Sequence, residues 1–200
     1  EESKNESDGE IYSFSNGLSS DNLEILEIPN FGSAMDRFNP DEAARVRWTF
    51  DGQEIFKSGV RAMAQASAEA IEKSGLSKED VDIFIPHQAN IRIVEALEKK
   101  LGLPNATTIK KVHRYGNTSA ASIPTAFVDA LEEGEIKGGE IAVFTAVGAG
   151  LAWGACAVRL GDRVTPINKS DAKLPDFDGT ATDTIKRAIE YQVPDKLDEI

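Results

Sequence analysis

Residues 81–90, Val-Asp-Ile-Phe-Ile-Pro-His-Gln-Ala-Asn, constrain the fold of this 200-residue chain more than any other stretch. Residues 81–85 are mostly apolar and favour a buried strand, which Pro86 ends because proline has no N–H to donate to a sheet. Residues 91–102 then carry apolar side chains at helical spacing and finish in glycine. His87 is therefore predicted to stand where a strand gives way to a helix. Functional sites collect at this edge in α/β folds.

Two later stretches repeat or extend this pattern. Residues 107–112 predict a short strand, and a helical run is predicted over residues 125–131, so that Asn117 stands at a second strand-to-helix turn. Residues 141–147 and 151–160 predict two buried strands joined by a tight Gly-Ala-Gly turn. Such a turn can present bare backbone N–H groups to a ligand.

The region before these motifs predicts one long helix and some strand pieces. Apolar spacing favours a helix over residues 53–73, with Asp51 as its cap. Strand pieces at residues 11–14 and 23–28 lie on either side of an Asn-Gly pair at 16–17, which is typical of a turn.

The composition excludes several classes of protein. The net charge of −12 argues against general nucleic-acid binding, and eleven acids against two bases in residues 1–42 predict a solvated acidic face. No run of eighteen apolar residues predicts a membrane span, and the acidic opening does not resemble a signal peptide. The single cysteine, Cys156, excludes an intrachain disulfide and suits a reducing compartment.

Three motifs together resemble one family. They are Pro-His-Gln-Ala-Asn at 86–90, Tyr-Gly-Asn-Thr-Ser-Ala-Ala-Ser-Ile-Pro at 115–124 and Gly-Ala-Gly-Leu-Ala-Trp-Gly-Ala at 148–155. In order and spacing they resemble the C-terminal half of β-ketoacyl-[acyl-carrier-protein] synthase III, the initiating condensing enzyme of the thiolase superfamily. The resemblance runs from about residue 11 to residue 160.

The resemblance implies an α/β fold, the thiolase-like αβαβα sandwich of two similar halves. Residues 1–160 would be its second, C-terminal half, built on a mixed five-stranded sheet. The chain would then begin within the larger protein. Residues 161–200 resemble a linker, with glycine, proline and serine at positions 161, 166, 170, 175 and 179. They are predicted to be a C-terminal extension of unknown role, with a short helix at 181–191.

The resemblance also implies a reaction and its residues. The resembled enzyme loads an acyl primer from acyl-CoA onto a cysteine, decarboxylates malonyl-acyl-carrier-protein and joins the two. His87 and Asn117 would donate neutral N–H groups to the enolate oxygen, and the backbone N–H of Ala149 would serve the second oxyanion. Cys156 is predicted to be a small core residue, so the family's nucleophile is missing from this chain. Outside these motifs, a lone histidine or asparagine at such a turn would be interpreted as structural.

Other residues are implied to contact the substrates. Gln53, Phe56, Asn90 and the backbone of Ala89 match positions that line the pantetheine tunnel in the family. For Phe56, packing in the core is an equally good interpretation.

Four basic residues match positions at which the family docks its acidic carrier protein: Lys57, Arg92, Lys99 and Lys100. Arg92 and Lys99 are seven residues apart, so they share one face of the predicted helix. The alternative is an ordinary solvated helix face.

Partners and cofactors follow from the same resemblance. Acyl-CoA and malonyl-acyl-carrier-protein would be substrates, with no cofactor and no metal. The other half, carrying the cysteine nucleophile, would be a partner, and the complete enzyme would be a cytoplasmic homodimer that starts fatty-acid synthesis or a related pathway. The alternative function is a non-catalytic thiolase-like module that binds a carrier protein or a partner half. The presence of both His87 and Asn117 favours the enzyme.

Overall fold

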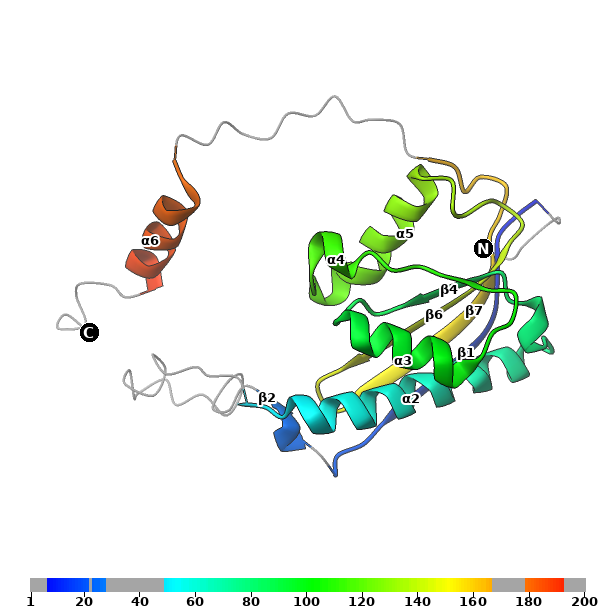
Figure 1. Ribbon diagram of the computed structural model, residues 1–200, viewed down its shortest axis with the longest axis horizontal. Coiled ribbons are helices and arrows are strands. Elements are labelled where there is room, and N and C mark those ends of the chain that lie inside the picture. The colour runs from blue at the N-terminus through cyan, green and yellow to red at the C-terminus, as the bar shows by residue number, and fades with distance from the viewer. Residues whose placement is uncertain (1–6, 22, 28–48, 167–178, 193–200) are drawn as a thin grey trace. The chain divides into compact units, whose positions relative to one another are not determined.

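The computed structural model of the chain describes residues 7–21, 23–27, 49–166 and 179–192. These residues fall into two units, residues 1–167 and residues 168–200 (Figure 1). In the second unit, helix α6 (Ala181–Gln192) matches the predicted short helix. None of the helices in the described segments is long and apolar enough to cross a membrane.

Among the described residues, a mixed five-stranded sheet forms the centre of the first unit, as the resemblance implied. Its strands are β1 (Glu10–Leu18), β4 (Ile83–Pro86), β5 (Thr107–Thr108), β6 (Ile141–Gly148) and β7 (Ala152–Arg159). They lie in the order β1-β7-β6-β4-β5. Strand β4 runs parallel to β5 and β6, whereas β7 runs antiparallel to β6 and β1. Two short strands, β2 (Leu26–Glu27) and β3 (Thr49–Phe50), pair separately.

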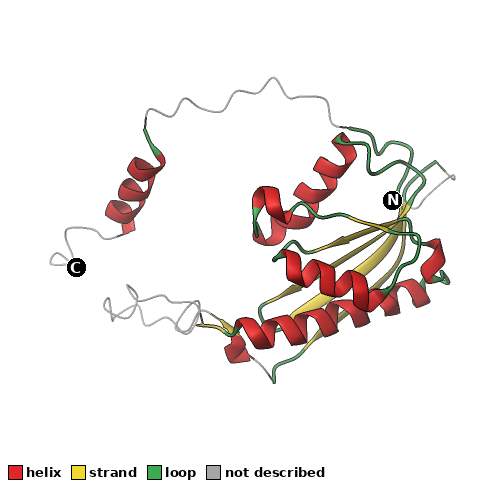
Figure 2. Ribbon diagram, viewed as in Figure 1, coloured by secondary structure: helices red, strands yellow, loops and turns green. Residues whose placement is uncertain are grey.

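Helices cover the two faces of the sheet unequally (Figures 1 and 2). Helices α2 (Gly52–Lys73) and α3 (Ile91–Leu101) pack on one face, and α5 (Ser122–Glu132) packs on the other. The short elements are α4 (Val112–Tyr115) and three 3₁₀ turns, η1 (Leu23–Ile25), η3 (Lys78–Asp80) and η4 (Ser119–Ala121).

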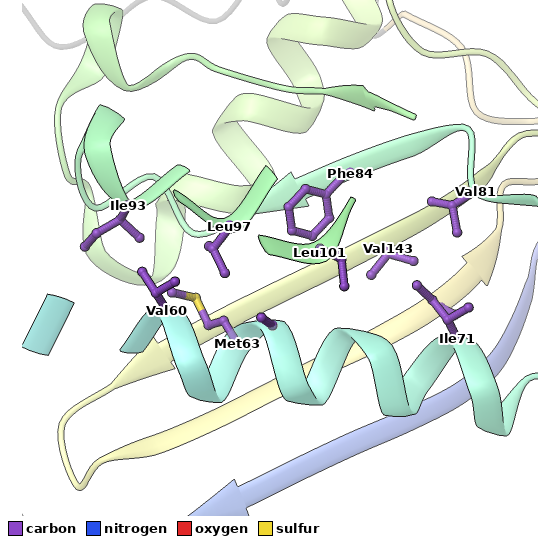
Figure 3. Close-up of a cluster of buried hydrophobic side chains, with 11 residues drawn as sticks. Val60, Met63, Ile71, Val81, Phe84, Ile93, Leu97, Leu101 and Val143 are labelled. Atoms are coloured by element: carbon purple, nitrogen blue, oxygen red, sulfur yellow. The ribbon is translucent and has the colours of Figure 1, made fainter. Parts of the chain in front are cut away.

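The larger core lies between the sheet and helices α2 and α3 (Figure 3). Met63 of α2, Leu97 of α3 and Phe84 of β4 are all fully buried within it. Burying a side chain of this kind contributes about 1.5–3 kcal/mol, so this cluster fixes both helices against the sheet.

The two helices of this core begin at side-chain caps. Asp51 Oδ1 accepts the N–H groups of Gln53 and Glu54, at 3.1 and 3.0 Å, which confirms the predicted cap of α2. Helix α3 ends at Gly102, whose φ of 60° is the left-handed conformation that favours glycine. The helix limits therefore agree closely with the sequence.

The strand predictions were less accurate. Strand β1 continues through Asn16 and Gly17 to Leu18, so the turn predicted at 16–17 is wrong. A Cβ at Gly17 would lie 2.5 Å from the Trp153 ring of the neighbouring strand. The glycine is there because an indole packs against its backbone. Strand β5 has two residues, Thr107 and Thr108, whereas a strand was predicted over 107–112. Val112, the last residue of that prediction, is instead the first residue of helix α4. Of the strand expected at 23–28, residues 23–25 form the 3₁₀ turn η1 instead and residues 26–27 form strand β2, while residue 28 lies outside the described part of the chain.

Candidate functional site

His87 follows the last residue of β4, and its neighbours fix its position. Its backbone N–H donates to the carbonyl of Thr145 on β6 at 2.7 Å, which extends the parallel pairing by one residue. Its Nδ1 lies 2.6 Å from Ser122 Oγ at the start of α5. The ring is half-buried, and burial lowers the pKa of His87 below its ordinary value. The imidazole is therefore neutral at pH 7.

The next residue, Gln88, ties two loops together and is itself only 2% exposed. Its Nε2 donates to the carbonyls of Pro86 and Ile109, at 2.7 and 3.1 Å. Its Oε1 accepts the N–H groups of Lys111 and Val112, at 2.9 and 3.1 Å. The loop after β4 is thus bonded to the segment that leads toward Asn117. Sequence reasoning had given Gln88 no role, although a polar residue inside the motif was the available signal.

Asn117 lies in an exposed turn between α4 and η4. Its Oδ1 accepts the N–H of Ser119 at 2.9 Å, which leaves its Nδ2 group as the donor. Gly116 and Ser119 on either side have positive φ angles of 67° and 54°. The side-chain amide of Asn117 therefore forms a hydrogen bond within a turn that has a residue of positive φ on each side of it.

Helix α5 holds the segment before Asn117 in place. Asp129, which is 8% exposed, accepts hydrogen bonds from Arg114 Nη1 at 2.8 Å and from Tyr115 Oη at 2.7 Å. The negative charge of Asp129 is the main cause that raises the pKa of the Arg114 guanidinium above its ordinary value. These bonds fasten α4 to α5 immediately before the turn.

An open cavity of about 390 Å³ gathers the three motifs. Its lining residues are His87, Ser119, Ala120, Ala146, Val147, Gly148, Ala152, Trp153 and Gly154. Asn117 and Ala149 do not line it, but each lies beside a lining segment, Asn117 two residues before Ser119 and Ala149 directly after Gly148. Ala149 is exposed in the turn that joins β6 to β7.

A second, larger hollow of about 990 Å³ lies between the start of α2 and the start of α3, and we call it the groove. It is lined by Gly52, Gln53, Phe56, Lys57, Asn90, Ile91 and Arg92. The structure thus brings together five residues that the sequence had assigned to substrate or carrier-protein contacts. Ala89 packs instead against the core, and Lys99 and Lys100 lie exposed near the end of α3.

Cys156 is half-buried on β7 rather than fully buried in the core, which corrects the sequence prediction. Ser13 and Ser15 bond to α2, so strand alternation puts Phe14 on the opposite face of the sheet. There Phe14 and Cys156 line a cavity of about 440 Å³ together with Phe144. Burial raises the pKa of the Cys156 thiol, so it is a poor nucleophile at neutral pH.

The described residues contain no group of three or more histidine, cysteine, aspartate or glutamate side chains that could hold a metal. The second histidine, His113, is exposed on α4.

The comparisons with known proteins agree on one family. The family model described as 3-oxoacyl-[acyl-carrier-protein (ACP)] synthase III C terminal matches residues 71–160. A β-ketoacyl-[acyl-carrier-protein] synthase III 2 of Vibrio cholerae is 48% identical over 177 residues, which are 88% of this chain and 48% of the relative. The β-ketoacyl-[acyl-carrier-protein] synthase III of Bacillus pumilus is 54% identical over 111 residues, which are 56% of this chain and 36% of the relative.

Solved structures give the same result. The 3-oxoacyl-[acyl-carrier-protein] synthase III of Aquifex aeolicus has a TM-score of 0.64 at 37% identity, over 79% of this chain and 46% of that one. The priming β-ketosynthase of the R1128 polyketide pathway has a TM-score of 0.69 at 31% identity, and the match covers 76% of this chain and 45% of that one. The chain thus spans about half the length of the relatives it matches.

The match to the Vibrio cholerae relative also bears on the extension. A match to 88% of a 200-residue chain is longer than residues 1–160, so it includes part of residues 161–200. The Bacillus pumilus match covers only 56% of the chain.

Proposed function

This chain is homologous to the C-terminal half of β-ketoacyl-[acyl-carrier-protein] synthase III, and from that premise we propose that it supplies the histidine and the asparagine of a Cys-His-Asn condensing site. The observation that carries the proposal is the meeting of the His87 loop, the Asn117 turn and the β6–β7 turn around one cavity. The cysteine would come from the N-terminal half of the complete enzyme, a term used below for this chain together with that half.

The proposed reaction has two parts. The cysteine thiolate of the other half attacks the carbonyl of acyl-CoA and takes the acyl group, and CoA leaves as its thiolate. Malonyl-acyl-carrier-protein then loses CO₂, the resulting enolate attacks the acyl carbonyl, and the cysteine thiolate leaves with its electron pair. The product is a β-ketoacyl-carrier-protein. This chemistry would start fatty-acid synthesis.

His87 and Asn117 would act on the enolate. Its negative charge develops on the thioester oxygen, so neutral N–H donors already in place stabilise the transition state. Burial keeps His87 neutral, and the bond from Ser119 to Asn117 Oδ1 leaves the amide Nδ2 free to donate. The backbone N–H of Ala149 would stabilise the other oxyanion, on the acyl-cysteine carbonyl.

The groove suits the pantetheine arm that both substrates share. The arm is neutral, with amide groups in an otherwise apolar chain, and the groove offers Phe56 together with the side-chain amides of Gln53 and Asn90. Asn90 is three residues after His87, so the same loop runs from the groove to the cavity. Lys57 and Arg92 line the groove as well, where they would meet the acidic carrier protein.

The face of the sheet opposite α2 would receive the other half. Phe14 and Leu18 are 63% and 73% exposed there, and an apolar cavity lies beside them. Exposed apolar side chains gathered in this way mark interaction surfaces. We also propose that the complete enzyme is a homodimer in the cytoplasm.

A chimera tests the proposed function. The N-terminal half of the Vibrio cholerae relative would be joined to this chain, and β-ketoacyl product would be measured from acyl-CoA and malonyl-acyl-carrier-protein. We expect product from the chimera and almost none from its His87→Ala variant. A folded chimera without product, beside an active Vibrio parent, would overturn the proposal. It would then favour a non-catalytic module that binds a carrier protein or a partner half.

A further inference from the structure

Ser122 contacts the catalytic histidine directly and has no role in the chemistry described so far. It is the first residue of α5 and only 3% exposed. Its Oγ lies 2.6 Å from His87 Nδ1 and 3.2 Å from the backbone nitrogen of Gln88. One buried hydroxyl therefore meets both the ring of His87 and the backbone that follows it.

The chemistry of these partners decides which way each hydrogen bond runs. A backbone N–H can only donate, so Ser122 Oγ accepts from Gln88. The hydroxyl still has one proton, and a buried hydroxyl without an acceptor is unfavourable. Among the described residues, the only other partner of Ser122 Oγ is His87 Nδ1. The hydroxyl therefore donates to Nδ1, which must be unprotonated.

We propose that Ser122 is a positioning residue that holds His87 in the tautomer with its proton on Nε2. A neutral imidazole carries one proton, so an unprotonated Nδ1 places it on Nε2. The Nε2–H is then the donor available to a substrate oxygen in the cavity. The catalytic part of this inference rests on the proposed function, whereas the tautomer itself does not.

Ser122 also connects the two donors of the site. The turn η4 runs into α5 directly before Ser122, and Asn117 precedes η4 by two residues. A residue at this place sets the position of the His87 ring relative to the segment that carries Asn117. Removing the Ser122 hydroxyl is therefore expected to lower the rate of malonyl decarboxylation, the step in which both His87 and Asn117 donate.

Nitrogen-15 NMR of histidine-labelled protein tests the tautomer directly. The chain has only two histidines, and His113→Gln leaves His87 as the single remaining signal pair. We expect Nε2 at its protonated position and Nδ1 at its unprotonated position at pH 7. In Ser122→Ala, the two tautomers should mix and the two shifts should approach each other. A wild-type His87 protonated on Nδ1 would overturn the inference.

Kinetics of the complete enzyme test the consequence. Ser122→Ala should slow malonyl decarboxylation about tenfold, which is less than the loss expected for deleting a donor outright. Acyl transfer onto the cysteine should be nearly unchanged. Ser122→Thr keeps the hydroxyl and should recover both the tautomer and the rate. Ser67→Ala is the matched control, because Ser67 is also a buried serine but its hydroxyl bonds to the carbonyl of Met63.

The outcomes separate the two proposals. A changed tautomer with an unchanged decarboxylation rate would overturn the positioning role and leave the proposed function standing. An inactive wild-type enzyme with an Nε2-protonated His87 would overturn the proposed function and leave the tautomer assignment standing.

Discussion

Asn90 accepts the backbone N–H of Ile93 at 3.0 Å, so the side chain that caps helix α3 belongs to a residue that also lines the groove. The oxygen of the amide is used for the helix. The nitrogen is left as a donor for a ligand. One residue therefore has a structural and a proposed binding role, and two substitutions separate them.

Asn90→Ala should lower the free energy of unfolding by about 1 kcal/mol, the usual value of an N-cap, and raise the KM for acyl-CoA. Asn90→Asp keeps an equally good cap but replaces the N–H donor with a negatively charged acceptor, so it should raise the KM at nearly wild-type stability. Denaturant unfolding and initial rates measure the two effects. If Asn90→Asp binds acyl-CoA like the wild type, the cap is the whole role of Asn90.

Replacing His87 or Asn117 by alanine in the complete enzyme should cut malonyl decarboxylation by roughly 10²- to 10³-fold, the cost of losing one oxyanion donor. Acyl transfer onto the cysteine should fall much less, because the enolate forms only in the second half-reaction. Single-turnover assays of each half-reaction measure both. Equal losses of rate in the two half-reactions would contradict the prediction that His87 and Asn117 act mainly in decarboxylation.

Decarboxylation should stay constant near pH 7 and fall only below pH 6.5. The reason is that burial lowers the pKa of His87 from its ordinary value of 6.5, and the neutral ring is the proposed donor. The same shift links pH to folding. Unfolded His87 binds its proton more readily, so the stability it contributes above pH 6.5 is lost as the pH falls through its lower folded pKa.

The pH–rate profile and acid unfolding measure these effects of His87. His87→Gln should flatten the acid loss of stability, and His113→Gln, at the exposed histidine, should not. A rate that falls already above pH 6.5 would contradict the assignment of His87 as the neutral donor.

Charge reversal at Arg92→Glu with Lys99→Glu should raise the KM for malonyl-acyl-carrier-protein roughly tenfold or more, because exposed positive charge steers an acidic partner. Acyl-CoA loading should be almost unchanged. The wild-type KM should rise with salt, as screening shortens toward about 8 Å.

A control with the same change of charge is Lys137→Glu with Arg163→Glu, since neither residue lies on α3 or lines the groove. It should leave the KM for the carrier substrate unchanged. If both reversals raise that KM equally, net charge rather than the groove decides binding.

Cys156 should take no part in the reaction. Its thiol has a raised pKa and lines a cavity on the face opposite α2, so residues 1–200 alone should form neither an acyl-enzyme nor a β-ketoacyl product. Cys156→Ala should leave the rate of the complete enzyme unchanged. Mass spectrometry after incubation with acyl-CoA measures the acyl group, and acylation of Cys156 would refute this prediction.

The sequence predicted the elements whose signal is local. Helix α2, capped by Asp51, has its cap and its apolar spacing within its own sequence. The two strands on either side of Ala149 have a glycine turn between them. The turn predicted at Gly17 was wrong because the glycine is required by the ring of Trp153, which is more than a hundred residues away in the chain. A glycine that makes room for a distant ring has the same sequence signature as a glycine in a turn.

The site was predicted by its motifs, and its supporting residues were not. The motifs pointed to His87, Asn117 and the groove residues, whose roles stay predictions here. Ser122 and Gln88 act through hydrogen bonds to residues that only the fold brings near. No periodicity marks such a contact. The place of both residues inside the motifs was the available signal, but their partners follow only from the structure.

The four side-chain hydrogen bonds of Gln88 have a mechanical consequence. They span the loop after β4 and the segment after β5, so the two loops behave as one piece of backbone. Fluctuations that carry one loop toward or away from the groove carry the other with it. We therefore expect the distance between the His87 loop and the start of α4, which leads into Asn117, to stay constant when either loop moves.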